Sequence, residues 1–364
     1  MKPLCTAPFT DFGIAAESYS SCCMSYIRYN DTDASSALNN KTITDVREAM
    51  IEHRFDDLPD SCKYCISSDL QHRFQQDNAV ISTNVSVSDV RNLILYPSNE
   101  CSGACIMCGD EFSRTYSKQY NPEQIQNIDN IDECIQSIND VTGADTIRIL
   151  GGNLQDMKRG TELVESLIDA DVNEVTIVTN GNSSTMRDGS DFFTHMFNLH
   201  MSGKHVRLVI SIDGVEDVNN VQRRFINYNR LCEFISKAKT YRSMYDVSLL
   251  ATITLYNIER FPELTSAFPD IEIGIGFISM PTNMAMSNAH PDFMKHSISV
   301  MQNADDCTAN RRVLNELKSV QSFSKYSHVN WLAFCKETLQ KAKREDLEKS
   351  SPVLLSFIDQ SIIL

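Results

Sequence analysis

Three cysteines with short, unequal gaps could hold a metal centre. Cys101, Cys105 and Cys108 are separated by three and two residues, so one loop can wrap around an iron–sulfur cluster. A 4Fe–4S cubane has four irons, and three thiolates leave one of them without a protein ligand. Because an open coordination position is typical of a catalytic metal centre, the spacing predicts a catalytic cluster, with Gly103 permitting the tight loop.

A zinc ribbon is the alternative interpretation of the same residues. It would take Cys105 and Cys108 as one pair and Cys62 and Cys65 as the other. It leaves Cys101 without a role, and it ignores the strand that precedes the loop.

Five more cysteines lie in the first 65 residues, and together they could bind a second metal centre. Cys22 and Cys23 are adjacent, so their side chains diverge and we expect only one of them to be a ligand. The predicted ligands of this second centre are therefore Cys5, Cys62, Cys65 and one of Cys22 and Cys23. The centre would be an iron–sulfur cluster, and structural zinc is the alternative. The other four cysteines lie in helix-like sequence and are expected to be buried: Cys134, Cys232, Cys307 and Cys335.

Strand and helix patterns alternate from residue 91 onward. Short apolar runs predict strands, and amphipathic segments between them predict helices. Asn121 and Pro122 are typical of a helix start, with an apolar face running from Ile125 to Ile138. The predicted strands are 93–96, 146–150, 174–178, 206–212, 247–254 and 271–278.

Repeated βα units imply a parallel sheet, and we predict an α/β fold with a partial (βα)6 TIM-type barrel. No Gly-x-Gly-x-x-Gly follows the first strand, which disfavours a dinucleotide-binding domain. In such barrels the chemistry lies on the loops after the strands, and the three-cysteine loop follows the first strand.

The rest of the chain divides into two further parts. Residues 1–90 read as a cysteine-rich module with a helix over 44–53, for which Thr44 is a candidate N-cap. So small a module has a thin core, which a metal site would stabilise. We predict that residues 91–285 form the barrel and that 286–364 form a helical C-terminal region.

Composition excludes several classes of function. The net charge of -15 has the wrong sign for non-specific nucleic-acid binding, which depends on Lys and Arg. No run approaches the ~18 apolar residues of a membrane span, and no apolar run follows Lys2 as in a signal peptide. We therefore expect a cytoplasmic protein, in which clustered cysteines indicate metal binding rather than disulfides.

With these features in place, the sequence resembles the radical SAM superfamily over about residues 91–280. The resemblance implies that the amino and carboxylate groups of S-adenosylmethionine (SAM) bind the open iron. One electron then cleaves SAM to methionine and a 5′-deoxyadenosyl radical, which abstracts hydrogen from an unidentified substrate. A one-electron reductant such as a flavodoxin or ferredoxin is implied as a partner.

Further motifs at strand ends support the resemblance, and it implies SAM-binding roles for their residues. Gly151-Gly152-Asn153 takes the place of the family's Gly-Gly-Glu, Thr179-Asn180-Gly181 is common in relatives, and Ser211-Ile212-Asp213-Gly214 resembles Ser-Leu-Asp-Gly. Arg223 or Arg224 would meet the SAM carboxylate. The implied cofactor-binding residues are Gly151, Gly152, Asn153, Asn180, Ser211, Asp213 and Arg223.

Two departures from the family pattern weaken the expected SAM contacts. Asn153 replaces a glutamate, which removes the charge-assisted part of a bond to an ammonium group. Met107 stands where the family often has an aromatic residue. A non-catalytic iron–sulfur or zinc protein with a degenerate SAM site is therefore the alternative function.

The first 65 residues resemble the auxiliary-cluster modules called SPASM or twitch. Cys5-Thr6-Ala7-Pro8-Phe9, Ser21-Cys22-Cys23 and the stretch from Thr44 to Cys65 carry this resemblance. It implies a second iron–sulfur cluster and, because enzymes with such clusters often modify peptides, a peptide or protein substrate.

Overall fold

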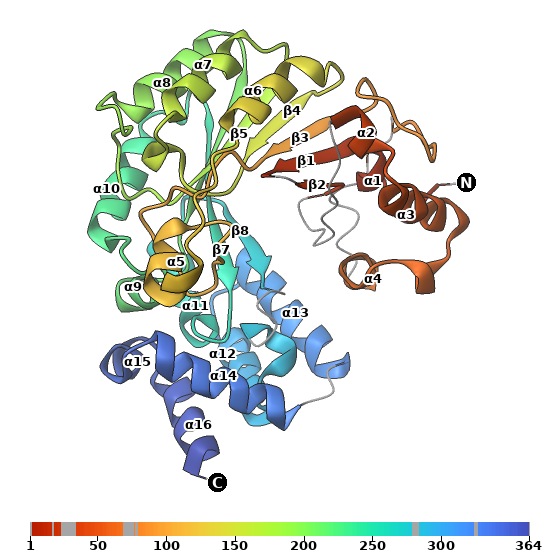
Figure 1. Ribbon diagram of the computed structural model, residues 1–364. Helices are drawn as coiled ribbons and strands as arrows, with labels where there is room; N and C mark the ends of the chain where they lie inside the picture. The colour runs from red at the N-terminus through yellow and green to blue at the C-terminus, as the bar shows by residue number, and fades with distance from the viewer. Residues whose placement is uncertain are drawn as a thin grey trace. The chain divides into compact units, whose positions relative to one another are not determined.

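The computed structural model describes residues 2–16, 18–22, 34–67, 76, 79–278, 284–323 and 327–363. It confirms the predicted α/β class. Within these residues, eight strands form one sheet in the order β2-β1-β3-β4-β5-β6-β7-β8 (Figure 1). The six predicted strands are present as β3 to β8. The strands are β1 (Asp11–Ala15), β2 (Ser18–Ser20), β3 (Asn92–Leu95), β4 (Thr146–Ile149), β5 (Glu174–Thr179), β6 (His205–Ser211), β7 (Asp246–Ile253) and β8 (Ile273–Phe277).

The sheet is mostly parallel, as βα connections require. β1 pairs antiparallel with β2, with Gly13 opposite Ser20. On its other edge β1 pairs parallel with β3, with Phe12 opposite Leu93. The pairs β3–β4, β4–β5 and β7–β8 are also parallel. The early cysteine-rich segment therefore contributes two strands to the same sheet as β3.

Helices follow most strands, in the predicted alternation. They are α1 (Ala7–Thr10), α2 (Ala34–Leu38), α3 (Lys41–Glu52), α4 (Asp60–Ser67), α5 (Arg114–Tyr120), α6 (Ile131–Asp140), α7 (Gly160–Asp169), α8 (Phe192–Met201), α9 (Asp217–Gln222), α10 (Tyr228–Lys239), α11 (Phe261–Ala267), α12 (Pro291–Gln302), α13 (Thr308–Phe323), α14 (His328–Lys341), α15 (Arg344–Ser350) and α16 (Pro352–Ile363). Short 3-10 helices include η1 (Phe55–Asp57), η3 (Pro122–Gln124), η4 (Leu154–Asp156), η5 (Ile258–Arg260) and η7 (Met286–Asn288).

The chain divides into two compact units. Unit 1 contains Met1–Glu100, Asn127–Val178 and Thr185–Arg207, and unit 2 contains Cys101–Gln126, Thr179–Ser184 and Leu208–Leu364. In unit 1, helices α6, α7 and α8 lie side by side (Figure 1). Its core is built from side chains that are almost fully buried, among them Phe12, Ile14, Leu93, Ile147, Ile177 and Phe193.

Unit 2 includes β7, β8 and the helices of the C-terminal region, which is helical as predicted. Trp331 on α14 is fully buried, and its indole N–H donates to Ser361 Oγ at 2.7 Å. Its ring packs near Phe293 and Phe334. Because Trp331 is the only tryptophan in the chain, its fluorescence reports the folding of unit 2.

Helix α3 begins earlier than predicted. Its N-cap is Asn40, whose side chain accepts a hydrogen bond from the Thr42 amide, so the prediction of Thr44 as N-cap was wrong. Thr44 lies within the first turns and its hydroxyl donates to the Lys41 carbonyl at 3.0 Å. A hydroxyl can satisfy a carbonyl inside a helix as well as cap one, so the sequence did not distinguish the two roles.

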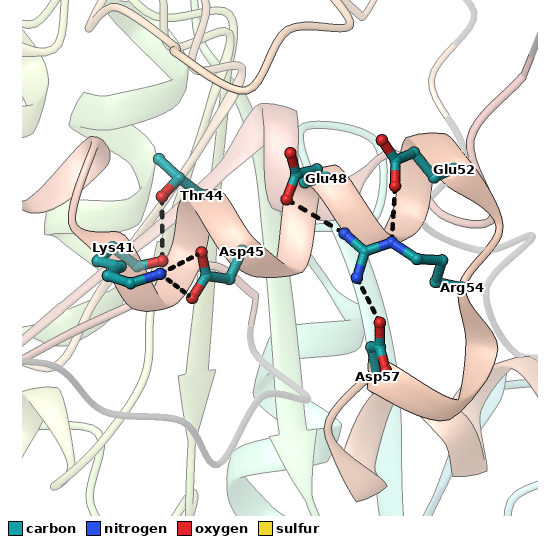
Figure 2. A network of polar contacts seen from close by, with 7 residues as sticks. All are labelled: Lys41, Thr44, Asp45, Glu48, Glu52, Arg54 and Asp57. Carbon is teal, nitrogen blue, oxygen red and sulfur yellow. Dashed lines mark hydrogen bonds and ion pairs between the residues drawn. The ribbon is translucent and has the colours of Figure 1, made fainter.

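The exposed side of α3 carries ion pairs (Figure 2). Lys41 contacts Asp45 at 2.8 Å, and Arg54 lies between Glu48, Glu52 and Asp57. Solvent-exposed pairs of this kind contribute little to stability. The opposite side, which includes Ile43, Val46 and Met50, is buried and holds the helix in place.

The helix predicted to begin at Asn121 is shorter than expected. Only the 3-10 turn η3 begins there, and α6 begins at Ile131. Between them the Ile128 amide donates to Asn99 Oδ1, and the Asn130 amide donates to the Pro97 carbonyl. These two amides therefore bond to the segment after β3 and do not form the hydrogen bonds of a helix.

None of the helices in the described part of the chain is long and apolar enough to cross a membrane.

Glu259 should make the stability of unit 2 depend on pH. Burial raises the pKa of its carboxyl from 4.5 to about 7, and the amides of Leu354 and Val353 at the start of α16 only partly oppose this. Neither carboxylate oxygen has a hydrogen bond of ordinary geometry within the described residues. Between these two pKa values the folded state holds a proton that the unfolded state has lost, so wild-type stability falls as pH rises.

The variant Glu259→Gln lacks this proton. We expect its free energy of unfolding, relative to wild type, to rise by up to about 3 kcal/mol between pH 4.5 and pH 7.5. Denaturation followed by Trp331 fluorescence at several pH values measures the difference. Parallel pH profiles for the two proteins would contradict the prediction.

Candidate functional site

The three-cysteine loop is held by backbone hydrogen bonds within unit 2. The Ala104 amide donates to the Arg224 carbonyl, and the Ile106 amide to the Gln222 carbonyl, both at 2.9 Å. Ser113 is the N-cap of α5, and its hydroxyl also donates to the Gly103 carbonyl at 2.5 Å. The segment 222–224 and helix α5 therefore fix the loop that carries Cys101, Cys105 and Cys108.

Gly103 packs closely against Ile226. A Cβ atom built at Gly103 would lie 3.0 Å from Cδ1 of Ile226, which is tighter than ordinary contact. The loop thus lies against Ile226 on one side, and a larger residue at 103 would require the Ile226 side chain to shift by a few tenths of an ångström; the backbone at Gly103 is not in the left-handed region, so the turn itself does not require glycine.

The three thiols lie close enough to influence one another. Burial raises the pKa of Cys108, and the neighbouring Cys105 and Cys101 raise it further. Burial also raises the pKa of Cys105, while the Arg223 guanidinium lowers it. Because neighbouring thiols resist losing their protons together, the set favours a bound cation that stabilises the thiolates. The residues present fit a cluster of iron and sulfur.

A single metal ion is a different case. Within the described residues, no three His, Cys, Asp or Glu side chains are grouped so that they could hold one metal ion. The cysteines of a cubane bind different irons, so they lie farther apart than the ligands of one ion. The absence of a one-ion site therefore does not test the proposed cluster.

Asn180 lies beside the first cysteine. It follows β5, and its Nδ2 group donates to Cys101 Sγ at 3.6 Å and to Ser102 Oγ at 3.3 Å. Asn182, two residues further on, donates to Ser102 Oγ and to the Phe225 carbonyl, both at 3.4 Å. Sequence reasoning did not identify Ser102 or Asn182, although the repeated asparagine in Thr179–Asn182 was a visible signal.

Asp213 and Arg223 form a buried ion pair. Arg223 Nε lies 2.7 Å from Asp213 Oδ2, and Nη2 donates to Oδ1 at 3.1 Å. The Thr252 amide also donates to Asp213 Oδ1, at 2.8 Å. Burial raises the pKa of Asp213, and Arg223 is the largest influence that opposes this. The pair holds the segment 222–224 against the end of β6, where Ser211 is also buried.

Gln222 strengthens the same anchor and was not predicted from the sequence. Its amide Nε2 donates to the Asp213 carbonyl at 3.4 Å, and its Oε1 accepts from the Thr254 hydroxyl at 2.7 Å. Because the Gln222 carbonyl receives the Ile106 amide, the buried polar groups around Asp213 are connected to the cysteine loop through one residue.

The Arg224 side chain lies beside α5. Its Nη1 lies 3.5 Å from Tyr120 Oη on α5, and the Lys341 ammonium lies over the rings of Tyr120 and Tyr116. Lys341 also donates to Tyr116 Oη at 3.0 Å. Of the two arginines proposed for the SAM carboxylate, Arg223 is thus paired with a carboxylate and Arg224 lies beside a tyrosine.

The residues after β4 belong to unit 1. Gly151 and Gly152 have φ values of 74° and 57°, and a Cβ atom at Gly152 would lie 2.6 Å from the Ser98 carbonyl oxygen. Asn153 is 1% exposed; its Nδ2 donates to Asp156 Oδ2 at 2.9 Å, and its amide donates to the Glu100 carbonyl at 2.8 Å. This turn lies against the segment 98–100, which leads into the cysteine loop.

Glu100 is a charged residue that the sequence did not single out. Its carboxylate accepts from the Lys158 amide at 2.7 Å and from Arg187 Nη1 at 2.5 Å. The residue just before Cys101 is therefore fixed within unit 1 by an ion pair.

The candidate site residues thus fall into two groups. Cys101, Cys105, Cys108, Asn180, Ser211, Asp213 and Arg223 belong to unit 2, whereas Gly151, Gly152 and Asn153 belong to unit 1. Apart from Ser211, which is described only as buried, the residues of each group are connected by the contacts described above.

Three of the early cysteines also lie near one another, within unit 1. Burial raises the pKa of Cys5 to about 12, and Cys65 and Cys62 add to this effect. Cys62 and Cys65 lie on α4, and the Leu4 amide donates to the Met50 carbonyl at 3.1 Å, which ties the first residues to α3. Cys22 is half-buried, and Cys23 lies outside the described residues.

Arg47 orders the backbone around these cysteines. It is almost fully buried and donates to three carbonyl groups: Pro8 at 2.7 Å, Leu38 at 2.6 Å and Thr83 at 3.1 Å. One guanidinium, which has five N–H donors, thereby joins three segments that are distant in sequence.

Of the four isolated cysteines, Cys134 and Cys335 are buried as predicted. Cys232 and Cys307 are only partly buried.

Comparisons with known proteins give no family model and no curated protein that matches this chain. Solved structures with similar stretches exist. "Native anSMEcpe with bound AdoMet" is 13% identical over 69% of this chain and 68% of that one, with a TM-score of 0.44. The complex of anSMEcpe with AdoMet and the Cp18Cys peptide is 14% identical over 58% of each chain, with a TM-score of 0.40. Streptococcus suis SuiB bound to S-adenosylmethionine is 15% identical over 63% of this chain and 43% of that one, with a TM-score of 0.37.

Proposed function

We propose that the chain is a radical SAM enzyme. The observation that carries the proposal is the loop of Cys101, Cys105 and Cys108, with three mutually interacting thiols, a bonded asparagine and a buried arginine beside them. The three thiolates would hold a 4Fe–4S cluster and leave one iron open. When bound, such a cluster would supply the electron that cleaves SAM to methionine and a 5′-deoxyadenosyl radical, which abstracts hydrogen from the substrate.

The residues around the loop would bind and orient the cofactors. The Asp213–Arg223 pair and Gln222 hold the backbone that receives the loop amides, so the thiols keep a fixed geometry. Gly151 and Gly152 bring the backbone of the turn close to the segment before Cys101. Asn153 and Ser211 complete the proposed SAM-binding set, together with Gly151, Gly152, Asn180, Asp213 and Arg223.

The proposal also includes a second cluster, a class of substrate, a cellular location and a reductant. Cys5, Cys62, Cys65 and one of Cys22 and Cys23 would hold a second iron–sulfur cluster in a cysteine-rich module over 1–90 that precedes the barrel and the helical C-terminal region. We infer a peptide or protein substrate, a cytoplasmic location, and reduction by a flavodoxin or ferredoxin. No nucleic acid is part of the reaction, since the net charge of -15 opposes phosphate binding.

Anaerobic reconstitution with iron and sulfide, followed by SAM and dithionite, tests the function. The protein should turn brown with broad absorption near about 400 nm, and it should release 5′-deoxyadenosine. A colourless protein with stoichiometric zinc would contradict the proposal. A brown protein that releases no 5′-deoxyadenosine would favour the alternative, a non-catalytic cluster protein with a degenerate SAM site.

A further inference from the structure

We propose that Asn180 is a positioning residue that raises the reduction potential of the cluster by donating a hydrogen bond to the Cys101 thiolate. The inference rests on the proposed function, because it requires a cluster on that thiolate. The Nδ2 group of Asn180 lies 3.6 Å from Cys101 Sγ, within reach of an N–H···S bond. The Gly103 amide donates to the same sulfur at 3.4 Å. The Cys101 sulfur therefore has one backbone donor and one side-chain donor within the described residues.

The position of Asn180 is fixed by its own turn. Its Oδ1 accepts from the Asn182 amide at 3.0 Å, and Thr179 Oγ1 accepts from the Gly181 amide at 3.1 Å. Gly181 has a φ of 63°, and a Cβ atom there would lie 2.6 Å from Leu231 Cδ1. The turn therefore follows one path, in which the Asn180 oxygen accepts from the backbone and the Asn180 nitrogen is directed toward Cys101 Sγ and Ser102 Oγ.

A bond to the sulfur affects the two oxidation states unequally. The reduced cluster carries one more negative charge than the oxidised cluster, so an N–H donor at a ligand sulfur stabilises the reduced form more. Hydrogen bonds from residues that surround metal ligands tune the metal in this way. Because Asn180 is 6% exposed, little water can take its place. Loss of the donor should therefore make the cluster harder to reduce.

The chain offers a matched pair of variants. Asn180 and Asn182 both accept a backbone amide on Oδ1 and donate to Ser102 Oγ through Nδ2. Asn180→Asp and Asn182→Asp each keep the accepting oxygen and add the same charge. Of these two variants, only Asn180→Asp loses a described hydrogen bond to the Cys101 sulfur. Asn180→Ser removes the donor without adding charge, and it separates the lost bond from the new carboxylate.

The experiment is a redox titration of the anaerobically reconstituted full-length protein, followed by electron paramagnetic resonance. The signal to follow is the one that changes on addition of SAM, since it belongs to the cluster with the open iron. At a fixed potential, the ratio of reduced to oxidised cluster should fall at least about tenfold in Asn180→Asp, a shift of about 59 mV for one electron. Asn180→Ser should lower the ratio about threefold, and Asn182→Asp should lower it less than Asn180→Asp.

Two outcomes would overturn the inference, and they are distinguishable. If all proteins show the SAM-sensitive signal but Asn180→Ser leaves the ratio at its wild-type value, or Asn180→Asp shifts it no more than Asn182→Asp, the Asn180 hydrogen bond does not act on the cluster. If the wild-type protein shows no SAM-sensitive signal, the proposed function itself is wrong, and the role of Asn180 is overturned with it.

Discussion

Replacement of Cys101, Cys105 and Cys108 by alanine should abolish the release of 5′-deoxyadenosine. The three thiolates are the proposed protein ligands of the cluster to which SAM binds, so the variant cannot hold that cluster. Partial activity is not expected, because an open iron exists only when the other three irons are held. The measurement is chromatographic detection of 5′-deoxyadenosine after incubation of the reconstituted variant with SAM and dithionite.

A buried cysteine outside the loop supplies the control. Cys335 on α14 is fully buried in unit 2 and is far from the proposed ligands in sequence. Cys335→Ala should keep its iron and its SAM cleavage, although it removes a thiol from the same unit. Turnover that survives the triple replacement, or that is lost equally in Cys335→Ala, would show that the loop is not the site.

Iron analysis of the triple variant gives separate information about the first 65 residues. If Cys5, Cys62, Cys65 and one of Cys22 and Cys23 hold a cubane, the variant should retain about four irons. Burial raises the pKa of Cys5 to about 12, and the smaller contributions of Cys65 and Cys62 to this shift support a shared site for the three thiols.

The strands were predictable because their signal is local. The runs at 93–96 and 174–178 became β3 and β5 with shifts of at most one residue at either end, since buried parallel strands need continuous apolar residues. That the three loop thiols lie near one another was predictable for the same reason, since the cysteines lie within eight residues, and their role as cluster ligands stays a prediction. Asp213 was singled out by a motif at the end of a strand.

Other features depend on contacts between distant residues, which local pattern does not carry. The apolar spacing from Ile125 onward predicted a helix, but Ile125 is 44% exposed, and the amides of Ile128 and Asn130 are bonded to the segment 97–99. Ser102 and Gln222 have no special residue type, and Asn182 was marked only by the repeated asparagine after β5. Their roles arise because the turn after β5 and the segment 222–224 are folded against the cysteine loop.

Arg223→Met should strongly destabilise unit 2. Asp213 is fully buried, and Arg223 supplies both the ion pair at 2.7 Å and a hydrogen bond at 3.1 Å. Without the guanidinium, the carboxylate keeps only the Thr252 amide among the donors described for its two oxygens. Removal of one partner from a buried ion pair costs about 3–5 kcal/mol, because the other charge stays buried without compensation. Denaturation of the cluster-free protein at pH 7, followed by Trp331 fluorescence, measures the loss.

The destabilisation caused by Arg223→Met should depend on pH and on whether Asp213 is present to carry a charge. Burial raises the pKa of Asp213 and Arg223 lowers it, so in Arg223→Met the folded carboxyl binds a proton well above its unfolded pKa of 3.8. The destabilisation relative to wild type should therefore be small near pH 4 and grow as pH rises. The double variant Asp213→Asn, Arg223→Met keeps an oxygen for the Thr252 amide but carries no charge, so it should be more stable at pH 7 than Arg223→Met alone. A double variant no more stable than the single one would show that packing, rather than the uncompensated carboxylate, accounts for the loss.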